Sequence, residues 1–170
     1  MLLLTLQTIN DRMKKLLLVR HAKASHDTSY NDFERPLKHS GINDVTFMAE
    51  RLKNESIIPQ ILVTSSAIRT EATADILSEH LLLPEPRLDK RIYDKGQHGI
   101  LNIINDFEDR YDFIGLVGHN PDIAQLVYYF TEEMRDVSPG TAILISFEVD
   151  EWKLVSKNSG TLAWFGSPKD

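Results

Sequence analysis

The sequence predicts an α/β fold, a three-layer α/β/α sandwich built on a mainly parallel central sheet. Two observations predict it. Short apolar runs of the kind found in strands buried on both faces recur along the chain, and segments with helical spacing of apolar residues separate them. Strands that alternate with helices imply right-handed crossovers, which make the strands parallel and cover both faces of the sheet.

The predicted buried strands are apolar runs that end abruptly in polar residues. Residues 16–20 form a near-continuous apolar run that stops at Arg20. Residues 61–64 and 113–117 repeat this design. Because apolar residues at every position suit a strand covered on both sides, we expect these three segments to be buried parallel strands.

The predicted helices follow these strands. Residues 38–54 have helical spacing, with one apolar face formed by Val45, Met48, Ala49 and Leu52. A helix over 67–81 ends ahead of Pro84, and another over 122–130 begins just after Pro121. Both boundaries suit proline, which is tolerated in the first turn of a helix and disrupts its interior. A shorter helix is expected over 99–107, with three isoleucines and a phenylalanine directed inward.

The C-terminal part of the chain predicts antiparallel strands. The alternate positions Ala142, Leu144, Ser146 and Glu148 suggest a strand, and the segment 152–157 follows. We expect these to be two strands joined around Asp150 and Glu151. The charged segments 26–35 and 85–97 are expected to be loops.

Length and composition favour one globular domain. The chain has 170 residues, of which 42% are apolar, and this is enough for a substantial core. It has no cysteine, which excludes disulfides, zinc–thiolate sites and cysteine nucleophiles. A net charge of −6 and the lack of any basic stripe argue against binding to nucleic acid or to a membrane surface.

The N-terminus gives no sign of export. No stretch approaches the roughly 20 apolar residues that span a bilayer. Residues 1–6 lack the basic region and cleavage site of a signal peptide. We expect a cytoplasmic monomer in which residues 13–170 form the domain. Residues 1–12 are interpreted as an N-terminal extension, ahead of a natural start at Met13, that contributes little to function.

Arginine and histidine residues follow the ends of the predicted parallel strands. Arg20 and His21 end the first strand, Arg69 lies in the first turn of the helix after the second, and His119 follows the third. Open α/β sheets bind ligands at the carboxyl ends of their strands, so we expect these four side chains at one edge of the sheet.

These residue types point to phosphoryl transfer. Arginine presents paired donors in a rigid fork, so Arg20 and Arg69 suit the oxygens of a phosphoryl group. A neutral imidazole is nucleophilic, and neighbouring arginines favour the neutral form of His21. His119 suits a hydrogen bond to a phosphate oxygen. The other histidines lie in loops or at helix ends without metal-ligand spacing, so we expect no metal and no cofactor.

Three motifs carry a resemblance to a known family. Residues 18–23 (LVRHAK), 65–74 and 117–121 (VGHNP) resemble, in order and spacing, the signatures of the histidine phosphatase superfamily, also called phosphoglycerate mutase-like. The likeness runs from about Lys14 to the C-terminus. Residues 22–23 and the segment 32–37 are similar to the SixA-type phosphohistidine phosphatases. The resemblance implies a phosphoglycerate mutase-like fold, transient phosphorylation of His21, and a phosphate surrounded by Arg20, Arg69 and His119.

The chain departs from the family pattern at two places. Ser66 replaces a proline that commonly follows the serine matching Ser65, which should alter a turn and no charge. Many relatives also carry an acidic residue after the second helix that protonates an alkoxide leaving group. Here Asp94, Asp89 or no residue serves as that acid. An imidazole leaving from a P–N bond needs protonation far less, so a weak acid suits phosphohistidine.

The sequence therefore leaves three hypotheses open. The first is a metal-independent phosphohistidine phosphatase that acts on a phosphorylated protein domain through His21. The second is a phosphatase for a small phosphate ester that uses Asp94 or Asp89 as the acid. The third is a non-catalytic module that binds phosphate without turnover. The presence of all four pocket residues favours the two enzymes over the binding module.

Overall fold

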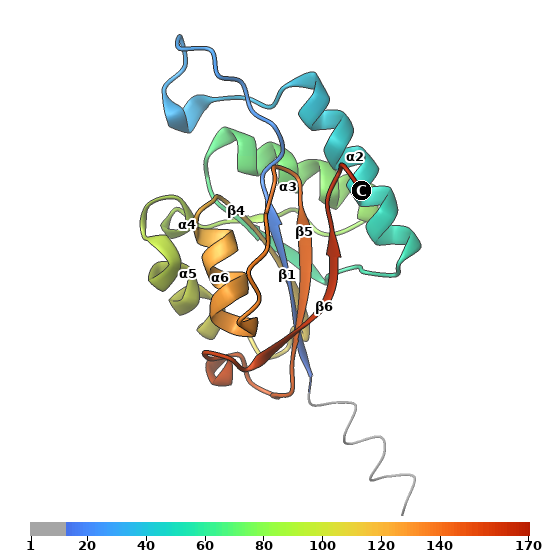
Figure 1. The fold of residues 1–170 in the computed structure, drawn as a ribbon, viewed down its shortest axis with the longest axis vertical. Helices are drawn as coiled ribbons and strands as arrows, with labels where there is room; N and C mark the ends of the chain where they lie inside the picture. Colours follow the sequence, from blue (N-terminus) through green and yellow to red (C-terminus); the bar gives the residue numbers. More distant parts are fainter. Residues whose placement is uncertain (1–12) are drawn as a thin grey trace, which may run out of the picture.

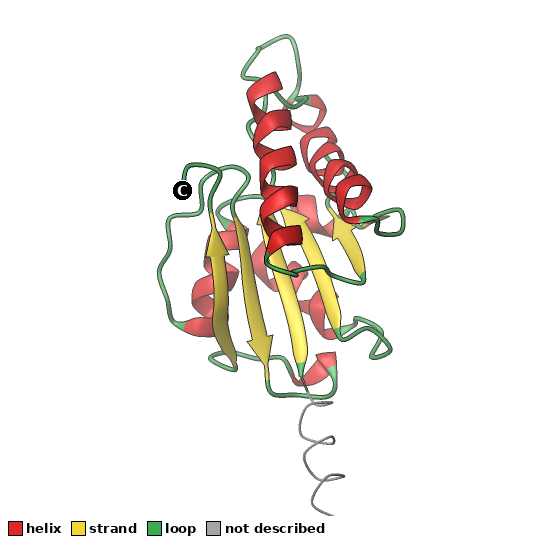
Figure 2. Cartoon of the chain, turned by 90° about the vertical axis from the view of Figure 1, so that its right-hand side faces the viewer, coloured by secondary structure: helices red, strands yellow, loops and turns green. Residues whose placement is uncertain are grey.

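The computed structural model describes residues 13–170 as a six-stranded sheet with helices on both faces (Figures 1 and 2). The strand order is β3-β2-β4-β1-β5-β6. The strands are β1 (Lys14–Arg20), β2 (Ile61–Thr64), β3 (Arg87–Leu88), β4 (Phe113–Gly118), β5 (Ala142–Phe147) and β6 (Gly160–Gly166). The helices are α2 (His39–Asn54), α3 (Ile68–Leu81), α4 (Arg91–Asp94), α5 (Gly96–Asn105) and α6 (Asp122–Thr131), with 3-10 turns η1 (Asp32–Glu34) and η2 (Trp152–Leu154). The predicted α/β fold is confirmed.

Strand β1 lies at the centre of the sheet. It pairs with β4 in parallel on one side and with β5 in the antiparallel sense on the other. Its residues Leu16, Leu17 and Leu18 are fully buried, as the continuous apolar run predicts. Strands β4, β2 and β3 are parallel to one another, and β5 and β6 add an antiparallel edge.

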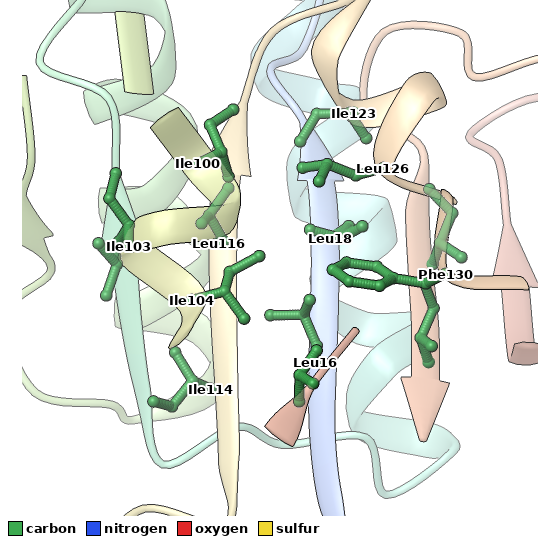
Figure 3. Packing of buried hydrophobic residues seen from close by; sticks show 14 of the residues in the cluster. Leu16, Leu18, Ile100, Ile103, Ile104, Ile114, Leu116, Ile123, Leu126 and Phe130 are labelled. Carbon is green, nitrogen blue, oxygen red and sulfur yellow. The ribbon is translucent and has the colours of Figure 1, made fainter. Parts of the chain in front are cut away.

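The side chains of β1 alternate between two apolar cores. Leu16 and Leu18 face the layer formed by α5 and α6, where Phe130 and Ile104 lie close to them (Figure 3). The alternate residues Leu17 and Val19 face the opposite layer, formed by α2 and α3. Because successive side chains of a strand point to opposite faces of the sheet, β1 contributes to both cores. Each face of the sheet is therefore anchored by β1.

The carboxyl ends of the parallel strands meet at one edge of the sheet. Arg20 of β1 is in register with Gly118 of β4. The amide of His21 donates to the carbonyl of Gly118, and the amide of Ser65, just after β2, donates to the carbonyl of Val117. These backbone bonds continue the ladder past the strand ends and bring three chain segments together there.

Two predictions about the secondary structure are wrong. Residues 152–157 do not form a strand, because η2 occupies Trp152–Leu154 and the antiparallel edge strand is β6. The indole N–H of Trp152 donates to the carbonyl of Tyr111 and its backbone amide donates to Asp109, which ties this segment to the chain before β4. The segment 85–97 is also not a simple loop, since it contains β3, α4 and the start of α5.

The loop that follows β1 projects beyond the sheet edge and is drawn in blue at the top of Figure 1. Its two ends are joined, because Ala24 bridges Leu37 and the amide of Lys38 donates to the carbonyl of Lys23. Gly41 of α2 packs directly on this carbonyl. The loop, which carries η1, is therefore fixed to α2 at its base.

No helix within residues 13–170 is long and apolar enough to cross a membrane. The interpretation of residues 1–12 as an N-terminal extension concerns residues outside those that the structure describes.

A substitution at Gly41 tests how the loop is attached. A Cβ atom at this position would overlap the backbone carbonyl of Lys23, which cannot rotate away. We expect Gly41→Ala to lower the free energy of unfolding by about 1–3 kcal/mol, the usual cost of overpacking. Urea unfolding measures this, with the exposed neighbour Ser40→Ala as the matched control. A Gly41→Ala variant as stable as Ser40→Ala would contradict the packing described.

Candidate active site

The four residues that the sequence analysis singled out converge at the sheet edge. His21 follows β1, Arg69 is the second residue of α3, and His119 follows β4. The Nε of Arg69 lies 3.3 Å from Nε2 of His21, and its Nη2 lies 3.2 Å from Nδ1 of His119. Both imidazoles are 8% exposed and Arg69 is 5% exposed. Arg69 thus links the two histidines in a largely buried cluster.

The hydrogen bonds of His21 define its tautomer. Its Nδ1 lies 2.8 Å from the carbonyl of Ala22, which can only accept, so the proton is assigned to Nδ1. The lone pair of Nε2 then faces the N–H of Arg69. Burial, followed by the charges of Arg69, Arg20 and Arg35, lowers the pKa of His21 to about 4, against the opposing effect of the Ala22 carbonyl. His21 is therefore neutral at physiological pH.

His119 has the opposite tautomer. Its Nδ1 accepts from Arg69, so its proton is on Nε2 and is donated to the Ser65 hydroxyl over 2.8 Å. Burial and the charge of Arg69 lower its pKa to about 3, although Asp32 acts in the opposite direction. The Ser65 hydroxyl in turn accepts from the amide of Ala67 at the start of α3. The sequence analysis quoted Ser65 for its motif only and did not predict this contact.

Arg20 contributes a second guanidinium near the imidazoles. Its Nη1 donates to the carbonyl of Val137 over 2.8 Å. Its Nε is buried and has no hydrogen-bond partner among residues 13–170. Burial lowers the pKa of Arg20, and the charge of Asp136 partly offsets this. An arginine stays charged throughout the physiological range, so its unpaired donor is available to an anion.

Asp32 of η1 is a site residue that the sequence analysis quoted in a motif without assigning it a role. Its Oδ2 lies 3.1 Å from Nη2 of Arg69 and accepts from the Tyr93 hydroxyl over 2.8 Å. Burial acts to raise the pKa of Asp32, but the hydrogen bonds from Tyr93, Arg69 and Arg35 outweigh it and lower this pKa to about 2. Asp32 is therefore ionised at neutral pH, on the exposed side of the site.

Tyr93 of α4 completes this side of the pocket. Its ring packs edge-on against His119, with centroids 5.5 Å apart, and against Phe33 of η1, with centroids 5.2 Å apart. The expected loop 85–97 gave no signal for this contact, which depends on the short helix α4. Asp32, Phe33 and Tyr93 therefore form a rim, and we use this name for them below.

The two carboxylates considered as general acids lie apart from this arrangement. Asp94 is exposed at the end of α4, and within the described chain no hydrogen bond or ion pair links it to the pocket residues. Asp89 accepts from the side chain of Arg91 through both of its oxygens. The Arg91 hydrogen bonds outweigh burial and lower the pKa of Asp89, so this carboxyl is ionised at neutral pH.

The arrangement can bind a tetrahedral anion and present a nucleophile to it. The outer edge of the Arg69 fork, Nη1 and one N–H of Nη2, is taken by the carbonyl and carboxylate of Asp32. Its inner edge, Nε and the other N–H of Nη2, faces the two histidines. Within residues 13–170 no group of three or more histidine, aspartate or glutamate side chains is placed to hold a metal ion.

Known proteins resemble this chain in sequence and in fold. The sequence profile of the histidine phosphatase superfamily (branch 1) matches residues 16–97. An uncharacterized protein of Picosynechococcus is 30% identical over 114 residues, which are 65% of this chain and 69% of that protein. An uncharacterized chloroplastic protein of Arabidopsis thaliana is 38% identical over 61 residues, which are 35% of this chain and 28% of that protein.

Several solved structures share the fold. A candidate phosphohistidine phosphatase SixA from Nakamurella has a TM-score of 0.79 at 20% identity, covering 93% of this chain and 98% of that one. The protein histidine phosphatase SixA in complex with tungstate has a TM-score of 0.74 at 20% identity, covering 91% and 97%. A mycobacterial glucosyl-3-phosphoglycerate phosphatase has a TM-score of 0.63 at 15% identity, covering 89% and 98%.

At these identities the solved structures establish the fold, and the motifs around His21 and Arg69 lie within the matched profile. The geometry of the two histidines and two arginines agrees with the motifs that suggested the family. The chain belongs to the histidine phosphatase superfamily, as a phosphatase of its branch 1.

Proposed function

We propose that this protein removes the phosphoryl group from phosphohistidine in a protein, through a phosphorylated His21 and without a metal ion. The observation that carries the proposal is the pairing of a neutral His21 with Asp32, the carboxylate at the site, whose low pKa leaves it no proton to give. The fold shared with SixA proteins supports the same assignment.

The first step needs a bound phosphoryl group and a free lone pair. The N–H groups of Arg20 and the inner edge of Arg69 suit the phosphoryl oxygens, whose charge they neutralise. When a phosphoryl oxygen binds the N–H of Arg69 that otherwise faces His21, Nε2 is free to attack. The His21–phosphorus bond then forms as the bond from phosphorus to the leaving group breaks.

The second step returns His21 to its starting state. The Ala22 carbonyl holds the proton on Nδ1 throughout, so the phosphorylated ring stays protonated on the nitrogen away from phosphorus. When water attacks phosphorus, the ring departs as a neutral imidazole and not as an anion. The backbone of Ala22 therefore assists both formation and hydrolysis of the intermediate.

The choice of leaving group follows from the ionised carboxylates. An alkoxide has a high pKa and needs a proton as it departs. Asp32, with a pKa of about 2, and Asp89, held by Arg91, carry no proton to give at neutral pH. A protonated phosphohistidine ring departs as neutral imidazole without such a donor, and this favours a P–N substrate over an alkyl phosphate.

A small phosphate ester is the alternative substrate. The fold shared with glucosyl-3-phosphoglycerate phosphatase and the Tyr93 hydroxyl at the rim favour it. However, this hydroxyl is already donated to Asp32, and that bond, followed by burial, raises the pKa of Tyr93. Tyr93 is therefore a poor acid at neutral pH.

Substitution of the nucleophile tests the proposal. We expect wild-type protein, without added metal, to release phosphate from a phosphohistidine protein faster than from an alkyl phosphate ester, and His21→Ala to abolish release because the attacking atom is gone. The exposed His26→Ala is the control and should retain full activity.

Two results would contradict the proposed function. Preference for the ester would assign the protein to small metabolites. Binding of the phosphoprotein without turnover would assign it to the class of non-catalytic phosphate-binding modules.

The protonation state of His21 is a second prediction. With a pKa of about 4, its ring should stay neutral as the pH falls through about 6.5, where an unperturbed histidine gains its proton. Titration of the imidazole signals by NMR, assigned with His21→Ala, measures this. A protonation of His21 near pH 6.5 would contradict the explanation of how the proposed nucleophile is kept unprotonated.

The third prediction concerns the planar shape of the Arg69 guanidinium. Lysine keeps the charge but cannot contact His21, His119 and Asp32 simultaneously, so Arg69→Lys should lower kcat/KM by roughly 100-fold or more. The exposed Arg110→Lys is the matched control. Near wild-type activity of Arg69→Lys would mean that charge alone is needed.

A further inference from the structure

The site is buried around its two histidines and Arg69 and exposed at its rim. His21, Arg69 and His119 are at most 8% exposed, whereas the Asp32 side chain is 57% exposed and Phe33 is 39% exposed. The nucleophile therefore attacks from the buried side. Because the leaving group departs in line with the attacking nitrogen, it must lie on the open side, next to the rim.

The rim residues have the chemistry of an imidazole site. Phe33 and Tyr93 offer two aromatic rings with an interplanar angle of 90°. Beside them, Asp32 accepts hydrogen bonds from Arg35 through Oδ1 and from Arg69 and Tyr93 through Oδ2. Oδ1 also lies 3.0 Å from Nη2 of Arg35, and the Asp32 side chain is 57% exposed, so a substrate N–H would approach this carboxylate from the solvent side.

We propose that Asp32 determines specificity by accepting a hydrogen bond from the N–H of the substrate's phosphohistidine ring, which keeps that ring protonated until it leaves. The inference rests on the proposed function and names the feature of the substrate that the rim recognises. Phe33 and Tyr93 border the same ring. Asp32 thus takes the place of a general acid without giving up a proton.

The step balances without any proton transfer to the leaving atom. The substrate ring carries its phosphoryl group on one nitrogen and a proton on the other. The bond from His21 Nε2 to phosphorus forms, the P–N bond breaks, and its electron pair returns to the ring. The ring was cationic and departs as neutral imidazole with its proton still facing Asp32.

The surrounding charges explain why a carboxylate is needed here. Arg69 from α3, Arg35 from the loop and Arg20 from β1 are cations that disfavour a protonated substrate ring. Tyr93 from α4 and the neutral His21 and His119 add no charge. Asp136 offsets part of the charge of Arg20, and Asp32, which its low pKa keeps ionised, is the anion at the rim. The same anion repels a departing alkoxide, so one side chain favours the P–N bond and disfavours the P–O bond.

The substitution Asp32→Asn tests this, because it removes the charge and keeps an oxygen for Arg69. We would measure kcat/KM against pH for a phosphohistidine protein and for p-nitrophenyl phosphate, whose leaving group needs no proton. With the phosphohistidine protein, the loss of rate at high pH should begin about one pH unit lower than in wild type, with about tenfold less activity on that side. With the aryl phosphate, whose phenolate departs as an anion, loss of the Asp32 charge should leave the rate unreduced or raise it, and the pH profile should not shift.

Two further variants separate charge from structure. Asp27 lies on the same loop as Asp32, and an asparagine there can still accept the hydrogen bond from the amide of Ser29. Asp27→Asn should therefore behave as wild type with both substrates. Tyr93→Phe removes a hydrogen bond but leaves the Asp32 anion in place, so the high-pH limb should not move.

The possible outcomes are distinct. Suppose that Asp32→Asn lowers kcat/KM equally for both substrates and leaves the high-pH limb of the profile where it is in wild type. This result would overturn the inference, since Asp32 would then only position Arg69. An equal shift of the high-pH limb in Tyr93→Phe and in Asp32→Asn would overturn the inference as well. If wild-type protein releases no phosphate from the phosphohistidine protein, the proposed function itself fails.

Discussion

The site depends on the buried guanidinium of Arg69. Its inner edge contacts Nε2 of His21 and the ring of His119, and its outer edge contacts the carbonyl and carboxylate of Asp32. One side chain therefore joins the ends of β1 and β4 to the loop that carries η1. An arginine is suited to this because its planar fork presents donors in fixed directions.

The same guanidinium contributes to the protonation states around it. Arg69 is 5% exposed, and its charge adds to the effect of burial in lowering the pKa of both imidazoles, and to the Tyr93 hydrogen bond in lowering the pKa of Asp32. The site thereby combines a neutral imidazole at the proposed nucleophile, cationic donors and an anionic rim. The two cores on either side of β1 supply the rigidity that such an arrangement requires.

Much of this could be predicted from the sequence, because the buried strands read as continuous apolar runs. The runs ending at Arg20 and Thr64 identified β1 and β2, and the residues after the parallel strands converge as expected. The antiparallel edge was misplaced because Trp152 is bound to residues 109–111, a contact distant in sequence. Asp32 and Tyr93 were not assigned roles for the same reason. Their pairing spans 61 residues and has no local periodicity.

The central claim is that His21 itself carries the phosphoryl group during turnover. Mass spectrometry of peptides from wild-type protein, mixed briefly with a phosphohistidine protein and quenched in alkali to preserve P–N bonds, tests it most directly. The account predicts one added phosphoryl group on the peptide that contains His21, localised to that ring, which appears and decays within a single turnover. Phosphate released at full rate with His21 unmodified at every time point, or a phosphoryl group on another residue, would contradict it.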